Sequence, residues 1–327
     1  MKRFFTIVTL LLITQFTTLF ALTANYQDED VRIDLIYTDT MVPGDALFVR
    51  MKVTTPKSVK KSKDTSTKTA MMKLYQGTKV IESSSFYTTN KNLKSGITEM
   101  LAGVPLSSWL KSADYSLKII FNLSETDARE FTLPVTFKSK TFNEESIYLN
   151  SANTAIRTDN SPERAAQIEK LNNILFTTNA ESVFNLTPFE NPSTSTYYTS
   201  HFADRRTYKY HNGKTATTLH YGNDYRAATG TPINACGDGK IVLAEWRNST
   251  GFSVVIEHLP GLYSIYYHCS ELIVKEGDMV KTGDLIAKSG STGLATGPHI
   301  HWEIRLNGEA VRPEFFLNDF AFENIEY

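Results

Sequence analysis

The stretch GSTGLATGPHIHWEIRL, residues 290–306, joins a glycine-rich loop to a strand pattern and decides the fold of the C-terminal half. Pro298 favours an extended backbone for the residue before it. Side chains two residues apart on a strand point to the same face, so His299 and His301 project together. We therefore predict a strand over residues 299–306 that presents two imidazoles on one face.

A second group of candidate ligands lies upstream, in HYGND, residues 220–224. His220 and Asp224 add an imidazole and a carboxylate to the strand histidines. Two histidines and one such pair are enough for a catalytic zinc ion, which takes three protein ligands and leaves one position open. Each motif is weak alone, because two histidines on one strand are common. All seven histidines lie beyond residue 200, which is the first functional indication.

Four segments between residues 198 and 317 are similar, in order and spacing, to the lysostaphin/LytM family of zinc endopeptidases. They are HYGNDY with GTPI (220–225 and 230–233), YYH (266–268), VKEGDMVKTG (274–283) and GSTGLATGPHIHWE (290–303). The family patterns that they resemble are H-x-G-x-D followed by G-T-P-V, Y-x-H, V-x-x-G-D-x-V-x-x-G and G-P-H-x-H. The resemblance implies a C-terminal β-rich metallopeptidase domain with an open groove, over residues 197–320.

The resemblance also implies a role for each matched residue. His220, Asp224 and His301 would bind one Zn²⁺, and His268 and His299 would be a catalytic pair that does not bind the metal. Zinc lowers the pKa of a bound water to about 7, and such a pair can orient the water, accept its proton and stabilise the oxyanion. The implied reaction is hydrolysis of peptide bonds in peptidoglycan stem or cross-link peptides. The sequence has no H-E-x-x-H motif, so the thermolysin arrangement is not expected.

Three positions depart from the family pattern without touching a predicted ligand. Asn223 stands where an aliphatic residue is usual, Ala203 replaces the glycine of an F-G-x-R motif, and Cys269 follows His268 where leucine is common.

Other polar residues of this half have two readings each. Glu303 shares a strand face with His301, so we expect it to hydrogen-bond a neighbouring imidazole or to line the groove, with general base as the alternative. His258 precedes a Leu-Pro-Gly turn and is expected to make surface or capping contacts. Tyr210 either assists at the oxyanion or is a loop residue.

The N-terminal half shows a different pattern. Residues 31–140 contain four runs of alternating apolar residues separated by turn signals, and they contain no histidine. This period of two predicts an antiparallel β-sandwich-like domain over residues 25–145. A run rich in Lys, Ser and Thr, residues 54–69, interrupts it and is expected to be a solvated loop, with weak contact to an anionic wall polymer as the alternative.

A helical linker is expected over residues 146–196. Ser161 followed by Pro162 is a helix start. Apolar residues with helical spacing follow it, which predicts a helix that packs between the domains. The mainly β fold class therefore includes one linker helix.

Residues 1–24 have the pattern of a secretory signal peptide. Lys2 and Arg3 precede an apolar run from Phe4 to Phe20, and small residues follow it. We expect export to the periplasm or cell envelope of a bacterium, with no membrane span after cleavage. An uncleaved membrane anchor is the alternative.

The composition is that of an ordinary globular protein. The chain of 327 residues is 41% hydrophobic, and its net charge of −1 gives no reason to expect a nucleic-acid partner. Cys236 and Cys269 are its two cysteines, and either one disulfide or two buried thiols is consistent with the sequence.

Two other function classes share part of this pattern. A catalytically silent relative that binds and regulates other cell-wall hydrolases would have lost one or more of the five site residues, and all five are present. The G-D-x-V-x-x-G hairpin also occurs in biotinyl and lipoyl carrier domains, but no lysine here lies at a suitable tight turn. The separate N-terminal domain suggests intramolecular regulation of the peptidase groove.

Overall fold

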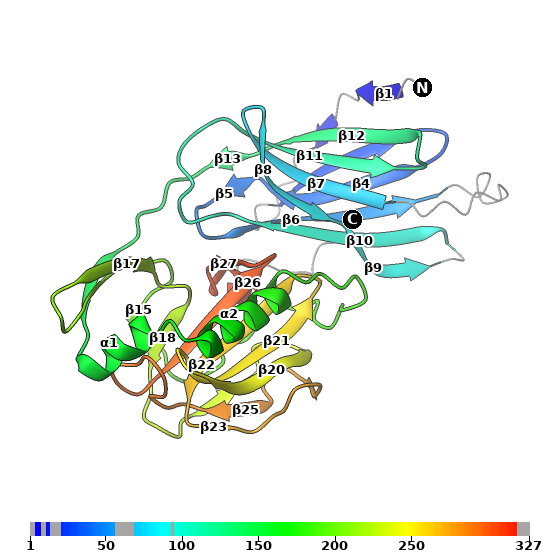
Figure 1. Cartoon of the computed structure of the whole chain (residues 1–327). Helices are drawn as coiled ribbons and strands as arrows, with labels where there is room; N and C mark the ends of the chain where they lie inside the picture. Colours follow the sequence, from blue (N-terminus) through cyan, green and yellow to red (C-terminus); the bar gives the residue numbers. More distant parts are fainter. Residues whose placement is uncertain (1–3, 8–10, 14–20, 56–68, 93–94, 319–327) are drawn as a thin grey trace. The chain divides into compact units, whose positions relative to one another are not determined.

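In the computed structural model (Figure 1) the chain forms two compact units, divided between Lys140 and Thr141. The residues described are 4–7, 11–13, 21–55, 69–92 and 95–318. Most of the predicted signal peptide and most of the lysine-rich run lie outside these ranges. Within them, no helix has both the length and the apolar character needed to cross a membrane.

The first unit contains two β-sheets. One has the order β1 (Phe4–Ile7), β12 (Asp127–Pro134), β11 (Tyr115–Asn122), β7 (Thr69–Gln76) and β8 (Lys79–Ser85). The other has the order β2 (Leu11–Ile13), β3 (Ala21–Gln27), β4 (Arg32–Thr38), β6 (Ala46–Thr54), β10 (Ile97–Pro105) and β9 (Tyr87–Asn92). Short strands β5 (Thr40–Met41) and β13 (Thr136–Phe137) pair in parallel. Neighbours within the two sheets are antiparallel apart from the β1–β12 pair.

One hydrophobic core joins the two sheets of this unit. Leu117, Ile119 and Phe121 on β11 are fully buried and alternate with partly exposed residues. They share a cluster with Ile33 and Leu35 of β4, which belongs to the other sheet. Inward-facing residues of two sheets that meet in this way make a sandwich core, so the predicted β-sandwich-like domain is confirmed.

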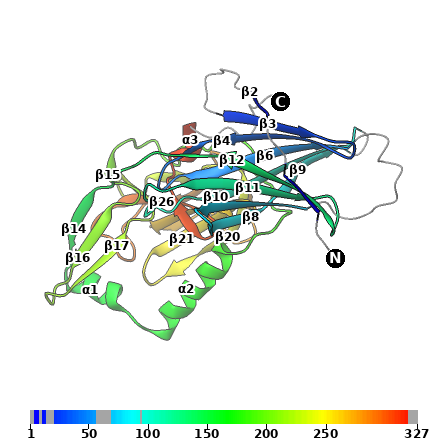
Figure 2. The same ribbon diagram turned by 90° about the horizontal axis from the view of Figure 1, so that it is seen from above.

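The second unit is organised around an eight-stranded sheet. Its strands run in the order β15 (Tyr198–Ser200), β18 (Asn223–Arg226), β26 (His299–Leu306), β22 (Leu262–Cys269), β21 (Gly251–Leu259), β20 (Gly239–Arg247) and β24 (Met279–Val280), with β27 (Glu309–Val311) beside β26. A three-stranded sheet consists of β14 (Glu144–Tyr148), β16 (Arg205–Lys209) and β17 (Thr215–Leu219), which lie side by side in Figure 2. Another consists of β19 (Pro232–Asn234), β25 (Leu285–Lys288) and β23 (Glu271–Leu272).

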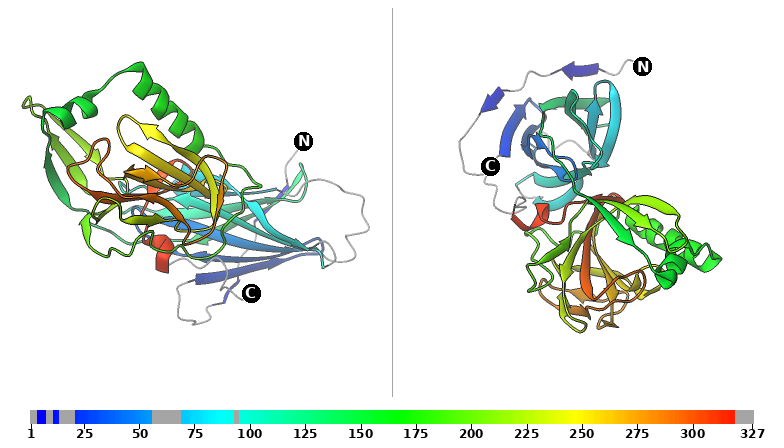
Figure 3. Two further views of the ribbon diagram at one scale, coloured as in Figure 1. Left: turned by 90° about the horizontal axis from the view of Figure 1, so that it is seen from below. Right: turned by 90° about the vertical axis from the view of Figure 1, so that its left-hand side faces the viewer.

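Three helices belong to the described part of this unit: α1 (Ser151–Thr158), α2 (Pro162–Leu175) and α3 (Phe315–Asn318). The predicted start of α2 is confirmed, because the Ser161 side chain accepts a hydrogen bond from the Arg164 amide and Pro162 is the first helical residue. Leu171 and Leu175 are buried in one cluster with residues of β20, β21 and β22. The helix therefore lies along the sheet of the second unit (Figure 3).

The two cysteines are free thiols in the structure. Cys236 and Cys269 are both fully buried. Burial raises the pKa of the Cys236 thiol to about 11 and that of Cys269 to about 12. Both side chains are therefore neutral, unreactive parts of the core.

Candidate metal centre

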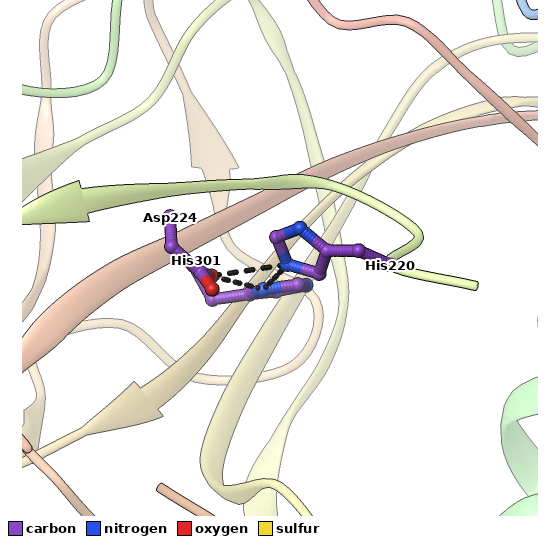
Figure 4. Close-up of side chains that lie close together, drawn as sticks. All are labelled: His220, Asp224 and His301. Atoms are coloured by element: carbon purple, nitrogen blue, oxygen red, sulfur yellow. Dashed lines mark hydrogen bonds and ion pairs between the residues drawn. The ribbon is translucent and has the colours of Figure 1, made fainter. Parts of the chain in front are cut away.

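Strand pairing brings the candidate ligands together. β18 and β26 are antiparallel, and Asp224 lies directly opposite His301 in their register. His220 lies four residues before Asp224, at the turn that leads into β18. Figure 4 shows the three side chains converging from these two elements. All three are buried.

The three ligand atoms are close enough for one small cation. His220 Nε2 lies 3.2 Å from Asp224 Oδ1 and 3.1 Å from His301 Nδ1. His301 Nδ1 lies 2.7 Å from Asp224 Oδ1. Ligands about 2.0–2.1 Å from a tetrahedral zinc are about 3.3 Å apart, so this triangle is close to one face of such a tetrahedron.

Hydrogen bonds fix which atom of each ligand faces this centre. His220 Nδ1 lies 2.9 Å from the His201 carbonyl and donates to it, which leaves Nε2 as the ligand atom. His301 Nε2 lies 2.9 Å from Glu303 Oε1 and donates to it, which leaves Nδ1 as the ligand atom. These tautomers follow from the neighbouring acceptors. Partners of this kind orient metal-binding histidines and raise their basicity.

The charges of the site favour a cation. Burial acts to raise the pKa of Asp224, but His220 and His301 outweigh it and hold that pKa well below its usual range. Burial acts against a charged His301, but its hydrogen bonds with Asp224 and Glu303 prevail and raise its pKa to about 9. Burial lowers the pKa of His220. The carboxylates of Asp224 and Glu303 therefore favour positive charge at the point where the three candidate ligand atoms meet.

The predicted catalytic pair lies beside the ligands. His268 is the second-last residue of β22, and its ring centroid is 4.9 Å from that of His299 and 5.9 Å from that of His301. His299 Nε2 is 3.6 Å from Asp224 Oδ1. The structure thus gathers all five predicted site residues in one cluster.

A single loop orients both histidines of this pair. His268 Nδ1 lies 2.7 Å from the Thr292 carbonyl, and His299 Nδ1 lies 2.8 Å from the Gly297 carbonyl. Donation to these oxygens leaves Nε2 of each ring as a proton acceptor. Burial, with the nearby His299 and His301, lowers the pKa of His268 to about 3. His268 is therefore neutral near pH 7.

The structure adds three residues that the sequence did not indicate. The Tyr267 ring stacks on His301 with centroids 5.2 Å apart and an interplanar angle of 11°. The Arg206 guanidinium contacts Asp224, and Glu145 contacts Arg206. No spacing pattern links these two to the ligands, because strand pairing brings them together.

His258 corrects one expectation. It is fully buried instead of lying at the surface. Its Nδ1 lies 2.7 Å from the Asp238 carbonyl and its Nε2 lies 2.7 Å from Ser264 Oγ. The turn that follows it connects two central strands of the eight-stranded sheet, so proximity to a turn did not mean exposure. Glu303 makes the imidazole contact that we expected of it, and Tyr210 lies at the β16–β17 turn, where its amide donates to the Lys214 carbonyl.

Known proteins contain segments that are similar in sequence to this part of the chain. A family model described as Peptidase family M23 matches residues 218–313. The DD-carboxypeptidase/endopeptidase Mpg of Neisseria meningitidis is 43% identical over 95 residues, which cover 29% of this chain and 22% of that protein. The peptidoglycan DD-endopeptidase ShyB of Vibrio cholerae is 37% identical over 92 residues, which cover 28% and 22%. The chain thus spans less than a quarter of the length of either relative.

One solved structure extends the likeness in fold beyond the matched segment. A Pseudomonas aeruginosa protein assigned to peptidase M23 covers 85% of this chain and 95% of its own, with a TM-score of 0.53 and 19% identity. This likeness concerns the fold alone. The match over residues 218–313, the two relatives and the His/Asp/His cluster agree with one another. Residues 218–313 therefore match a peptidase M23 domain, in agreement with the resemblance to lysostaphin/LytM-type peptidases.

Proposed function

We propose that this protein is a secreted, zinc-dependent endopeptidase that hydrolyses peptide bonds in peptidoglycan stem or cross-link peptides. The convergence of His220, Asp224 and His301 carries the proposal, because three ligand atoms within 4.8 Å of one another leave a coordination position open. His268 and His299 beside this centre support hydrolysis over binding alone.

The nitrogen and oxygen ligand set suits zinc. Two imidazoles and one carboxylate bind Zn²⁺ well, and each ligand here has its other polar atom engaged by a neighbour. When bound, zinc supplies a Lewis acid that promotes the ionisation of water near pH 7. Asp224 would offset part of the charge of the ion.

The chain's own histidines perform the proton transfers in this proposal. In this proposal neutral His268 accepts the proton of the attacking water at Nε2, and His299, whose ring centroid lies 4.9 Å from that of His268, acts on the same carbonyl. His299 then stabilises the developing oxyanion, and the accepted proton passes to the amine that leaves. The Thr292 and Gly297 carbonyls hold both rings in position throughout.

The substrate class follows from the relatives and from export. The Vibrio relative is named as a peptidoglycan DD-endopeptidase. Peptidoglycan peptides are short and flexible and contain D-residues, so an open groove suits them better than a deep pocket. The predicted signal peptide would place the enzyme in the periplasm or cell envelope, where this substrate is found.

Digestion of purified peptidoglycan tests the proposal. The mature protein is incubated with added zinc, with a chelator, and as the His301→Ala variant, and the released fragments are identified by mass spectrometry. Zinc-dependent peptide cleavage that the variant lacks is expected, and the fragments identify the bond. A folded protein that neither cleaves nor binds zinc would indicate the binding-regulator class instead.

We also propose that the N-terminal unit regulates access to the groove. It is a separate folded body with its own core and none of the five site residues. A variant lacking residues 25–140 is expected to cleave faster than the mature chain, and an equal or slower rate would contradict regulation by inhibition. The deletion has to stop at Lys140, because Glu145 contacts Arg206 beside the metal centre.

A further inference from the structure

Arg206 contacts the metal centre from outside the ligand set. Its Nη2 lies 2.9 Å from Asp224 Oδ2, the carboxylate oxygen that does not face the two histidines. The other oxygen, Oδ1, lies within 3.2 Å of both His220 Nε2 and His301 Nδ1. The two oxygens of the Asp224 carboxylate therefore have different partners. Oδ1 faces the candidate cation position, and Oδ2 accepts a hydrogen bond from the Arg206 guanidinium.

Arg206 is itself held on two further sides. Its Nε forms an ion pair with Glu145 of β14, and its Nη2 lies 2.7 Å from Ser200 Oγ of β15. Ser200 Oγ also lies 3.0 Å from Glu145 Oε1. The Arg206 side chain is only 12% exposed and that of Asp224 is 11% exposed. A nearly buried guanidinium with two acidic partners and a hydroxyl has little freedom to leave its position.

These contacts lie outside the segment shared with the family model. Glu145, Ser200 and Arg206 all precede residue 218, where that match begins. β14 reaches the site because it pairs in parallel with β16, which places Glu145 directly opposite Arg206. The metal centre is thus supported by a strand that lies some way upstream in the chain.

We propose that Arg206 is a positioning residue for the zinc ligand Asp224, and that Glu145 holds Arg206 in place. This inference rests on the proposed zinc site. By occupying Oδ2, the guanidinium would leave Oδ1 as the oxygen of Asp224 available to a metal ion. Its single positive charge also offsets part of the negative charge of Asp224 and Glu145.

The guanidinium group is needed for its shape as well as its charge. Its Nε and Nη2 contact Glu145 and Asp224 at the same time from fixed positions in one plane. A lysine ammonium is a single charged point on a flexible stem and cannot reproduce this fork. Arg206→Lys is therefore expected to restore only part of what Arg206→Met removes.

Zinc affinity measures this role directly, without any use of peptidoglycan. The full chain is stripped of metal and its zinc dissociation constant is determined by competition with a chromogenic chelator. Loss of a group that orients a metal ligand weakens metal affinity roughly 10–100-fold, and we expect this for Arg206→Met, with Arg206→Lys between it and the unmodified protein. The cobalt-substituted protein provides a second readout, because a carboxylate that turns to bind through both oxygens raises the coordination number and changes the visible spectrum.

Two further variants make the result specific. Arg205→Met is the matched control, because it removes a guanidinium from the residue just before Arg206 on β16. The guanidinium carbon of Arg205 lies 4.7 Å from the centroid of the Phe142 ring. Arg205→Met is expected to change neither the zinc affinity nor the cobalt spectrum. Glu145→Gln leaves Arg206 and its contact with Asp224 present but removes the ion pair between Arg206 and Glu145. A smaller loss of zinc affinity than in Arg206→Met is therefore expected. Glu145→Gln also tests the inference if Arg206→Met does not fold.

The outcomes separate this inference from the proposed function. An unmodified protein that binds no zinc would remove the basis of both. Strong zinc binding by the unmodified protein, with the same affinity and the same cobalt spectrum in folded Arg206→Met and in Glu145→Gln, would overturn the role of Arg206 alone. An equal loss of affinity in Arg205→Met would also overturn it, because the effect would then be one of net charge.

Discussion

His301 and Glu303 project from the same face of β26, and the ring Nε2 of the histidine lies 2.9 Å from a carboxylate oxygen of the glutamate. Glu303 is in turn held by Arg305, whose Nη2 lies 2.7 Å from the second carboxylate oxygen. This pair of contacts turns the other ring nitrogen of His301 toward Asp224. One strand therefore supplies a candidate metal ligand and the group that orients it, two residues apart.

Replacing Glu303 should weaken metal binding. Burial acts to raise the pKa of Glu303, but Arg305 and His301 outweigh it and lower that pKa to about 2, so the group is a carboxylate over the working pH range. Glu303→Gln keeps an acceptor oxygen but loses the charge that increases the basicity of His301. We expect zinc affinity to fall by about tenfold. Chelator competition measures it, and Glu309→Gln, an exposed position on β27, is the control.

Replacing His268 should separate catalysis from metal binding. His268 has a φ of 60°, in the left-handed region that asparagine tolerates, so His268→Asn introduces little backbone strain. Loss of a general base lowers the rate by about 10²–10⁴-fold, and we expect this loss in kcat while the zinc content stays at one ion per chain. His301→Ala should lose both. A His268→Asn protein that no longer holds zinc would show that His268 is a ligand instead.

Much of the site could be predicted because residues close together in the sequence determine its geometry. The two-residue period over residues 299–306 places His299 and His301 on one face of a strand, and the structure has that strand as β26. The start of α2 was equally local, since Ser161 and Pro162 are sufficient to mark it. In both cases residues adjacent in sequence determine the geometry.

The remaining features depend on pairing between distant segments. Every residue of β22 is buried and nearly every residue of β21, because these central strands are covered on both faces. Such strands do not alternate between apolar and polar residues, so no sequence pattern indicates that His258 is buried. The contact of Arg206 with Asp224 likewise needs β14, β16 and β18 to come together, and no local pattern reports it.

Gly222 should tolerate no side chain. A Cβ at this position would lie 2.2 Å from the Trp302 carbonyl oxygen and 2.8 Å from Glu303 Cγ. Gly222→Ala therefore has to displace β18 from β26, and Asp224 would move away from His301. We expect loss of zinc binding and a lower melting temperature. Gly213→Asn is the control, since nothing lies within 4 Å of its Cβ and its φ of 80° suits asparagine. Normal zinc affinity in Gly222→Ala would show that the two strands separate without moving the ligands.

The stability of the protein should depend on pH through His258, which is distant from the ligands in the chain. Burial lowers the pKa of His258 to about 4, from a usual value of 6.5. Between these values the unfolded chain binds a proton that the folded chain does not. The free energy of unfolding therefore falls as the pH drops from 6.5 toward 4, by at most about 3 kcal/mol from this one group.

His258→Gln tests this contribution by removing the titrating ring. At pH 7.5 the variant should be less stable than the unmodified protein, because it disturbs the hydrogen bonds with Ser264 and the Asp238 carbonyl. The difference should shrink as the pH falls to 4.5, since only the unmodified protein loses stability through His258. Denaturant unfolding at several pH values measures it, with His211→Gln, an exposed histidine, as the control. Parallel curves for His258→Gln and the unmodified protein would mean that the buried ring takes up its proton without opposing the fold.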